Sequence, residues 1–212
     1  QLAKGEVVVI SVPVSGRTLD EVLSKMVESA LKKLPAPKIM RWGNNSVEFV
    51  RPVHGLVMMH GSHVVPGEVF GLKSSNRTLG HRFLSAKPIK LERADDYERA
   101  LREKGQVVAN FAERRAQIVK QLDRAASGAE LVVDDTLLDE VTALVEAPMV
   151  YAGEFNPEFL SLPQECLVLS MQQHQKYLPL RDKSGSKLLP RFLWRDGDAA
   201  FGVVIDCVDG ET

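Results

Sequence analysis

Cationic side chains with aromatic neighbours are the residues of this chain whose types and spacing best fit a binding function. Six cations fall between positions 73 and 93, where Glu92 is the only acid. Because positive groups neutralise phosphates and rings stack on bases, this combination suits RNA. A solvated charged surface is the alternative that composition leaves open. The cations are Lys73, Arg77, Arg82, Lys87, Lys90 and Arg93, and Arg41 and Arg51 lie upstream near Trp42 and Phe49.

The other reactive side chains form no catalytic or metal-binding pattern. Cys166 lies early in a predicted helix, where a helix N-terminus can lower the pKa of a thiol, but its leucine neighbours favour a buried structural cysteine. His60 and His63 flank a two-residue turn, and no third metal ligand has a matching spacing. The glycine-rich phosphate-binding motifs and the GxSxG motif do not occur in the sequence. We therefore expect no catalytic residue and no metal site.

The composition is that of an ordinary globular protein. The 212 residues are 44% hydrophobic and 26% charged, which is enough apolar material for a core. Lys and Arg total 27 against 28 Asp and Glu, so the net charge of -1 does not by itself indicate a nucleic-acid binder. Two cysteines, Cys166 and Cys207, exclude a disulfide scaffold. No apolar run approaches the ~20 residues that span a bilayer, and we expect a cytoplasmic protein.

Strand and helix patterns alternate irregularly along the chain, which predicts an α+β fold with mostly antiparallel sheets. Residues 6–12 are β-branched and predict a buried strand. Thr18 with Glu21 forms a capping box that starts an amphipathic helix. Pro35 and Pro37 stop this helix and mark the best candidate domain boundary.

Short strands and turns are predicted downstream of that boundary. Residues 47–70 contain three strand-like segments, and residues 60–63 between two of them predict a tight hairpin turn. Residues 71–80 are polar and bounded by glycines, which predicts a surface loop. Further short strands are expected at residues 81–84 and 88–91.

Helices dominate the prediction from residue 94 onward. One helix is expected at residues 94–104, and Asn110 with Glu113 caps a second. Thr136 with Asp139 caps a third, while the adjacent Asp134 and Asp135 suit a helix cap better than a catalytic carboxylate pair. Residues 149–154 predict a strand, and Pro163 opens a last helix through His174.

We divide the chain into three parts on this basis. Residues 1–37 form a strand–helix unit that is part of an N-terminal module, and residues 38–193 form a mixed α+β core region. Residues 194–212 form a divergent tail of unknown role. The first residue is Gln1 instead of Met, from which we expect a piece of a longer protein.

Several short strings follow one another in a distinctive order. At these spacings the chain resembles the β subunit of the bacterial-type glycyl-tRNA synthetase from about residue 7 to residue 193. The strings are Met40-Arg41-Trp42-Gly43, Phe49-Val50-Arg51-Pro52-Val53-His54, Pro66-Gly67-Glu68, Gly80-His81-Arg82-Phe83, Leu137-Leu138-Asp139-Glu140-Val141, Leu144-Val145-Glu146-Ala147-Pro148, Phe159-Leu160-Ser161-Leu162-Pro163, His174-Gln175-Lys176-Tyr177 and Leu188-Leu189-Pro190.

The resemblance implies a function for the whole family. Its members form an α2β2 enzyme, or an α–β fusion in organelles, that attaches glycine to tRNA(Gly) with ATP and Mg. The active site lies on the alpha subunit, and the β subunit supports the reaction through subunit assembly and tRNA binding. This chain would correspond to an N-terminal part of β, with a fold that resembles the editing-type domain of the phenylalanyl-tRNA synthetase β chain. The implied partners are the alpha subunit and tRNA(Gly), not DNA or a membrane, and the segment itself would bind no cofactor.

Five cations are the candidate residues for contact with RNA or with the alpha subunit. The loop departs from the family pattern, because Asn76 stands where the family has Gly and Leu79 where a second basic residue is common, and this weakens a grip on RNA by paired charges. A second departure follows Leu193, where the chain does not continue with the family's Asn-containing strand and Arg-rich segment. Arg51 has an alternative role as a buried ion-pair anchor at a strand start. The candidates are Arg41, Arg51, Arg77, Arg82 and Lys176.

Two other function classes remain open at this point. An editing-type hydrolase of amino acids or aminoacyl-tRNA would need a compact set of nucleophile or metal ligands. A pure protein-interaction domain would not bind RNA at all. Binding of tRNA(Gly) that depends on salt separates the second from an RNA-binding segment.

Overall fold

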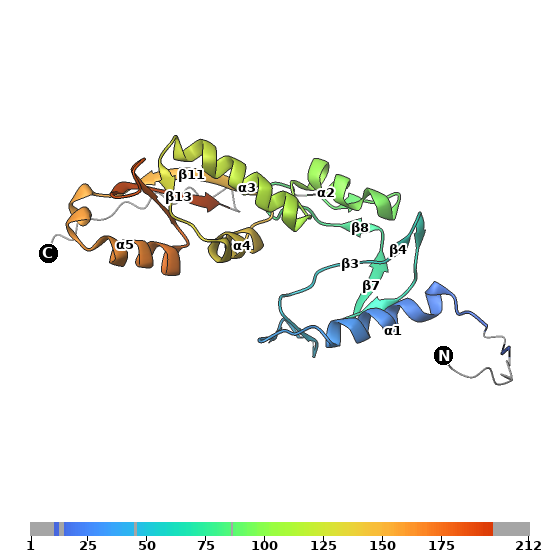
Figure 1. The fold of residues 1–212 in the computed structure, drawn as a ribbon. Coiled ribbons are helices and arrows are strands. Elements are labelled where there is room, and N and C mark those ends of the chain that lie inside the picture. Colours follow the sequence, from blue (N-terminus) through green and yellow to red (C-terminus); the bar gives the residue numbers. More distant parts are fainter. Residues whose placement is uncertain (1–10, 13–14, 45, 86, 197–212) are drawn as a thin grey trace, which may run out of the picture. The chain divides into compact units, whose positions relative to one another are not determined.

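A computed structural model describes residues 11–12, 15–44, 46–85 and 87–196 of the chain. The chain folds as two compact units, residues 1–76 (unit 1) and residues 77–212 (unit 2) (Figure 1). The predicted strand at residues 6–12 lies mainly outside the described residues. The predicted domain boundary after residue 37 stays a prediction. Within the described part, no helix has both the length and the apolar character that a membrane span requires.

Unit 1 packs one helix onto a small core. Helix α1 (Leu19–Lys32) starts after Thr18 as predicted, but the Thr18 side chain makes no capping bond. Its carbonyl oxygen instead accepts a hydrogen bond from the Glu21 N–H at 3.2 Å. The core consists of buried Met58, Val65 and Val69, against which Leu23, Val27 and Leu31 of α1 pack.

A close approach between α1 and the strand region depends on Gly67. A Cβ atom at this position would lie 2.7 Å from the Met58 Cε and closer still to the Ser24 Oγ. The Ser24 Oγ is also buried without a hydrogen-bond partner. An unsatisfied buried hydroxyl costs free energy, so Ser24 fits this contact by size and not by polarity.

We therefore expect Ser24→Ala to leave the free energy of unfolding unchanged or to raise it by up to about 1 kcal/mol. Gly67→Ala should lower it by about 1 kcal/mol through overpacking, and less so in the Ser24→Ala background because the hydroxyl is gone. Urea unfolding of the two single variants and the double variant measures this coupling. Additive effects of the two substitutions would contradict the predicted contact.

The strands of unit 1 are short and mostly antiparallel. The predicted hairpin at residues 60–63 is confirmed, and His60 and His63 are cross-strand partners. The predicted surface loop at residues 71–80 is wrong, because it contains the central strand of a three-stranded sheet ordered β3-β7-β6. The strands are β1 (Met40–Arg41), β2 (Glu48–Phe49), β3 (Leu56–Val57), β4 (Met59–His60), β5 (His63–Val64), β6 (Glu68–Val69) and β7 (Leu72–Ser75).

Only the pairing of β3 with β7 is parallel among the described strands, so the predicted α+β class with mostly antiparallel sheets is confirmed. Serine-rich β7 forms a strand because its backbone is paired on both sides. Leu72 pairs with Val69 of β6, and Ser74 pairs with Leu56 of β3. The Ser74 hydroxyl also donates to the Val65 carbonyl oxygen at 2.5 Å. Tertiary pairing thus overrides the loop-like composition.

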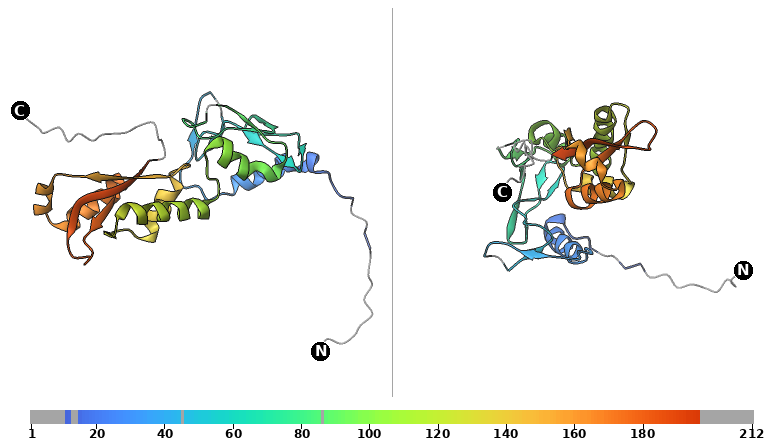
Figure 2. Two further views of the ribbon diagram at one scale, coloured as in Figure 1. Left: turned by 90° about the horizontal axis from the view of Figure 1, so that it is seen from above. Right: turned by 90° about the vertical axis from the view of Figure 1, so that its left-hand side faces the viewer.

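Unit 2 contains a larger sheet in the order β10-β12-β13-β11. The longest strand, β13, runs through the sheet centre and includes the first three residues of the predicted tail; residues 197–212 of that tail lie outside the described residues. Helix α3 runs beside β11 and β13 (Figure 2). The strands are β10 (Glu130–Leu131), β11 (Met149–Glu154), β12 (Leu178–Arg181) and β13 (Leu188–Asp196); the helices are α2 (Tyr97–Gly105), α3 (Phe111–Ala126), α4 (Asp135–Ala143) and α5 (Gln164–Ser170).

The core of unit 2 lies between this sheet and helices α3 and α4. It is mainly aliphatic, and buried Thr142 of α4 donates its hydroxyl hydrogen to the Leu138 carbonyl oxygen at 2.7 Å. Arg115 of α3 ties the two helices together through Asp139 at 2.7 Å and Asp135 at 2.5 Å. The hydrogen bond to Asp139 is the main cause that raises the pKa of Arg115 above its usual value. The buried core residues are Ile118, Leu122, Ala126, Leu137, Leu138, Val141, Val145, Leu178, Leu180 and Leu193.

Helix caps follow the sequence closely in one case and not in the other. Asn110 caps α3 as predicted, since its Oδ1 accepts from the Glu113 N–H at 3.1 Å. The predicted cap at Thr136 is wrong: Asp134 caps α4, and its Oδ1 accepts from the Leu137 N–H at 2.7 Å. The expectation that the two adjacent aspartates serve a helix cap is thereby confirmed for Asp134.

The last predicted helix begins as expected, but its cysteine does not lie in the core. Helix α5 starts directly after Pro163, and a π-helical turn (Met171–Gln175) continues it. Cys166 is exposed, so the prediction of a buried structural cysteine is wrong. The physical reason is that α5 buries none of its residues, so leucine neighbours in sequence do not enclose the thiol.

Candidate RNA-binding site

The basic segment predicted from the sequence folds into an antiparallel strand pair. Strands β8 (Arg77–Thr78) and β9 (Ile89–Lys90) place Arg77 and Lys90 directly opposite each other. Both side chains are exposed. Directly opposed residues have Cβ atoms about 5 Å apart, and like charges in this position destabilise a strand pair. Lys90 also pairs with exposed Glu92 at 3.0 Å.

An exposed aromatic ring lies in the turn that follows β8. Phe83 is 43% exposed, and the guanidinium carbon of Arg82 lies 5.5 Å from the centre of its ring. A cation over an aromatic face is a favourable pair at the surface. Together, Arg82 and Phe83 form a composite of a planar cation and a ring, two groups that both stack on nucleobases.

Buried His81 holds this turn in place. The residue is 2% exposed, and its Nδ1 accepts hydrogen bonds from the N–H groups of Phe83 and Leu84, both at 3.3 Å. Its backbone N–H donates to the carbonyl oxygen of Gly105 at 2.7 Å, and its carbonyl oxygen accepts from the Ser85 N–H at 2.9 Å. The turn is therefore fixed at the C-terminal end of α2, and this holds Phe83 in its exposed position.

Two glycines permit this attachment. A Cβ atom on Gly80 would lie 2.5 Å from the Gly105 Cα and 2.6 Å from its carbonyl oxygen. These are backbone atoms, which cannot rotate away as a side chain does. The Gly80–Gly105 contact therefore brings the turn against α2 at a distance that a larger residue at position 80 would prevent.

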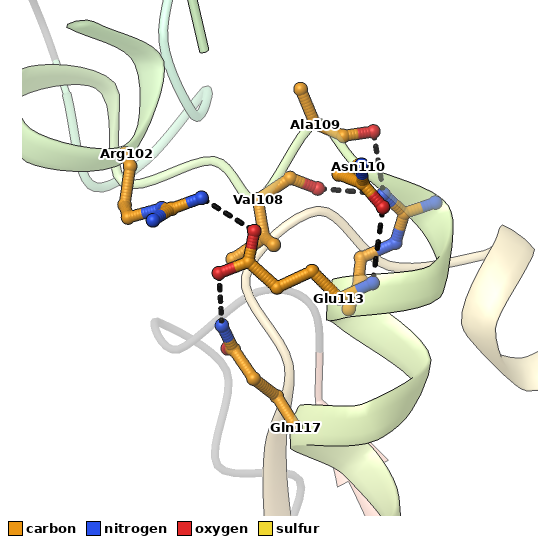
Figure 3. Close-up of polar contacts among 7 residues, drawn as sticks. Arg102, Val108, Ala109, Asn110, Glu113 and Gln117 are labelled. Carbon is orange, nitrogen blue, oxygen red and sulfur yellow. Dashed lines mark hydrogen bonds and ion pairs between the residues drawn. The ribbon is translucent and has the colours of Figure 1, made fainter. Parts of the chain in front are cut away.

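Helix α2 is in turn anchored to α3, as Figure 3 shows. Arg102 of α2 donates to a carboxylate oxygen of Glu113 at 2.5 Å. The other oxygen of Glu113 accepts from Gln117 at 3.5 Å, while the Glu113 N–H is capped by Asn110. One acidic residue in the first turn of α3 thus connects the helix that carries Gly105 to the helix that covers the main sheet.

Arg114 fixes the connection between α2 and α3. Its Nη1 donates to the carbonyl oxygens of Val108 at 2.6 Å and Ala109 at 3.2 Å. Its Nε donates to the carbonyl oxygen of Thr142 at the end of α4, at 3.0 Å. A single guanidinium group therefore satisfies three backbone acceptors from two separate segments.

The five predicted contact residues are divided between the two units. Arg77 and Arg82 lie in the β8 strand and the turn after it, within unit 2. Arg41 belongs to unit 1 and pairs with Glu48 across the β1–β2 strands at 3.2 Å. Lys176, in unit 2, pairs with Glu140 of α4 at 3.0 Å.

Arg51 is exposed in unit 1. The alternative that it serves as a buried ion-pair anchor is therefore wrong. Neither Arg51 nor Pro52 belongs to a strand, because β2 ends at Phe49 and β3 begins at Leu56. An exposed cation remains compatible with the predicted role in RNA or subunit contact.

Sequence reasoning missed Phe83 and the two residues that position it, His81 and Gly80. All three belong to the string Gly80-His81-Arg82-Phe83, of which only the arginine was selected as a contact. The sequence signal that could have identified them is the order glycine, histidine, arginine and phenylalanine, directly before a predicted strand with basic residues. Among the described residues, no three His, Cys, Asp or Glu side chains lie together in a way that could hold a metal ion.

Comparisons with known proteins give a consistent family. The profile of the family described as glycyl-tRNA synthetase beta subunit matches residues 1–200. A glycine–tRNA ligase beta subunit of Neisseria meningitidis is 54% identical over 181 residues, which are 84% of this chain and 26% of that protein. The beta subunit of Aromatoleum aromaticum is 53% identical over 180 residues, and that of Leptothrix cholodnii is 50% identical over 197 residues.

The matched region is a limited part of these relatives. The chain spans about a quarter of the length of the curated relatives, 26% to 28% for the three named above. The family profile nevertheless covers nearly the whole chain, and the match extends across both compact units. The chain therefore belongs to the glycyl-tRNA synthetase beta subunit family.

Proposed function

We propose that this chain supports ATP-dependent attachment of glycine to tRNA(Gly) by binding the tRNA and by assembling with an alpha subunit that carries the active site. In this proposal the complex works in the cytoplasm and uses ATP with Mg, while this segment binds no cofactor and catalyses no step alone. Membership of the beta subunit family supports the reaction. The opposed exposed cations Arg77 and Lys90 support the tRNA contact.

The opposed cation pair is the observation that carries the RNA part of the proposal. Arg77 and Lys90 are exposed and directly opposed on the strand pair, so a phosphate between them would meet two cations at once. Arg41 and Lys176 have carboxylate partners, as Lys90 does, and they keep their proposed role in RNA or subunit contact. Arg51, which is exposed, keeps its proposed role as a contact residue in unit 1.

Titration of tRNA(Gly) at about 50 and about 200 mM salt tests this proposal, since released counterions make phosphate binding salt-dependent. The wild-type chain should bind more weakly at the higher salt concentration. Arg77→Gln with Lys90→Gln should lower the slope of log K against log salt by about 1 for each phosphate that is no longer neutralised. Lys120→Gln with Arg124→Gln removes two exposed cations of α3; this charge-matched control should leave the slope unchanged.

Absence of tRNA binding at the lower salt concentration would contradict the RNA contact and leave a protein-interaction domain. An editing-type hydrolase is excluded or supported by a separate assay, the release of amino acid from glycyl- or alanyl-tRNA by this chain. The likeness to the editing-type domain of the phenylalanyl-tRNA synthetase β chain stays a prediction. It would gain weight only if such release were measured.

A further inference from the structure

The turn after β8 has a property that phosphate binding alone does not require. Phe83 is 43% exposed beside Arg82, in a turn that buried His81 holds from both sides. The exposed part of this apolar ring is in contact with water, which is unfavourable, and a ligand that covers the ring would gain free energy. Phe83 lies in the connection between β8 and β9, the two strands that carry the exposed cations Arg77 and Lys90. This arrangement points to a ligand that has both a flat apolar face and negative charge.

We propose that Arg77, Arg82, Phe83 and Lys90 form a binding site for an unpaired nucleotide of RNA. The base stacks on the ring of Phe83 next to the Arg82 guanidinium, and the flanking phosphates lie against Arg77 and Lys90. This inference rests on the proposed tRNA-binding function and narrows it to a single-stranded part of the RNA.

An unpaired nucleotide fits better than a duplex for a geometric reason. Bases inside an A-form helix are stacked on both faces, and side chains cannot enter its deep, narrow major groove. An aromatic side chain stacks only on a base that is already splayed out at a loop, a bulge or an end. A duplex would use the cations but leave the Phe83 ring in water.

Preorganisation of the turn supports the same conclusion. Ordering a flexible loop on binding reduces affinity. Here the Ser85 hydroxyl donates to the Lys104 carbonyl oxygen at 3.0 Å, and the His81 N–H donates to the Gly105 carbonyl oxygen at 2.7 Å. The turn is thus joined to the end of α2 at two points before any ligand arrives.

Unit 2 offers a matched control for this site. Phe111 at the start of α3 is 42% exposed, and the guanidinium carbon of Arg114 lies 5.5 Å from its ring centre. Exposure and cation distance are thus almost the same as for Phe83. Phe111 differs in its surroundings. Arg114 is engaged with backbone carbonyl oxygens, and Phe111 lies at the start of a helix, not beside a strand pair that carries two opposed cations.

The test uses the full chain and three probes: tRNA(Gly), a single-stranded RNA of about ten nucleotides that contains 2-aminopurine, and a duplex of the same sequence. Phe83→Leu should weaken binding of the single-stranded RNA about tenfold and remove the quenching of 2-aminopurine. Phe83→Trp should retain both, and Phe111→Leu should change neither. Binding of the duplex should be unaffected by Phe83→Leu.

Two outcomes separate this inference from the function on which it rests. If tRNA(Gly) binds with the expected salt dependence but Phe83→Leu behaves as wild type, the nucleotide site is wrong and the RNA contact stands. If no RNA binds to the wild-type chain, both are wrong. Thermal unfolding of the variants shows whether a loss is due to misfolding, and a Phe83→Leu variant that melts like wild type yet weakens only single-stranded RNA supports the site.

Discussion

Gly80→Ala is expected to lower the free energy of unfolding by about 2–3 kcal/mol, since overpacking that forces backbone to move is costly. The added Cβ would meet the Cα and the carbonyl oxygen of Gly105 at 2.5 and 2.6 Å, and the Ser85 Cβ at 2.8 Å. Relief requires that the turn separate from α2. The hydrogen bond from the His81 N–H to Gly105 would then be broken as well.

Urea unfolding of Gly80→Ala and of the wild-type chain measures this loss of stability, with Gly55→Ala as the control variant. A Cβ at Gly55 meets nothing within 4 Å, so this variant should stay within about 0.5 kcal/mol of wild type or gain slightly through a less flexible unfolded chain. Gly80→Ala should also weaken binding of single-stranded RNA, because Phe83 would no longer be held in place. Equal stability of both variants would show that the close contact does not exist.

Arg114→Ala is the second substitution with a large expected effect, a loss of about 2–3 kcal/mol in the free energy of unfolding. Hydrogen bonds to charged groups each contribute about 1.5–3 kcal/mol, with incomplete additivity within one network. The carbonyl oxygens of Val108, Ala109 and Thr142 would all lose their guanidinium donor. Water can reach the exposed part of this region, which limits the loss.

Two further variants calibrate that result. Arg114→Lys keeps the charge but offers a point donor instead of a planar fork, so it should recover less than half of the loss. Arg124→Ala removes an exposed cation of the same helix and should stay within about 0.5 kcal/mol of wild type. Full recovery by lysine would mean that charge and not the fork geometry stabilises the connection.

A series of contacts in unit 2 leads from the main sheet to the turn that carries Phe83. The main sheet and its apolar core fix α3, and Glu113 and Arg114 fix α2 relative to α3. The end of α2 then holds His81 and the turn. These hydrogen bonds join separate elements of the chain: Arg102 of α2 to Glu113 of α3, Arg114 of α3 to Thr142 of α4, and His81 to Gly105 of α2. The exposed ring of Phe83 is therefore a consequence of the whole arrangement.

The comparison of Phe83 with Phe111 shows why exposure and neighbours need the tertiary structure. Both rings have a nearby arginine and nearly the same exposure. The sequence does not show that Arg114 is engaged with three carbonyl oxygens. The exposure of Cys166 also depends on the tertiary structure. Its sequence neighbours are leucines, but it lies on helix α5, none of whose residues is buried.

Features whose physical cause lies within a few residues could be predicted from the sequence. Asn110 and Glu113 specify a helix start, residues 60–63 specify a hairpin, and the ordered short strings specify the family. Which residues meet across the fold depended on tertiary contacts. These contacts made a strand of serine-rich β7, gave Arg41 and Lys176 carboxylate partners, and set Arg77 opposite Lys90. A cap closes its hydrogen bond within one turn of helix, whereas strand register and charge pairing depend on segments that only folding brings together.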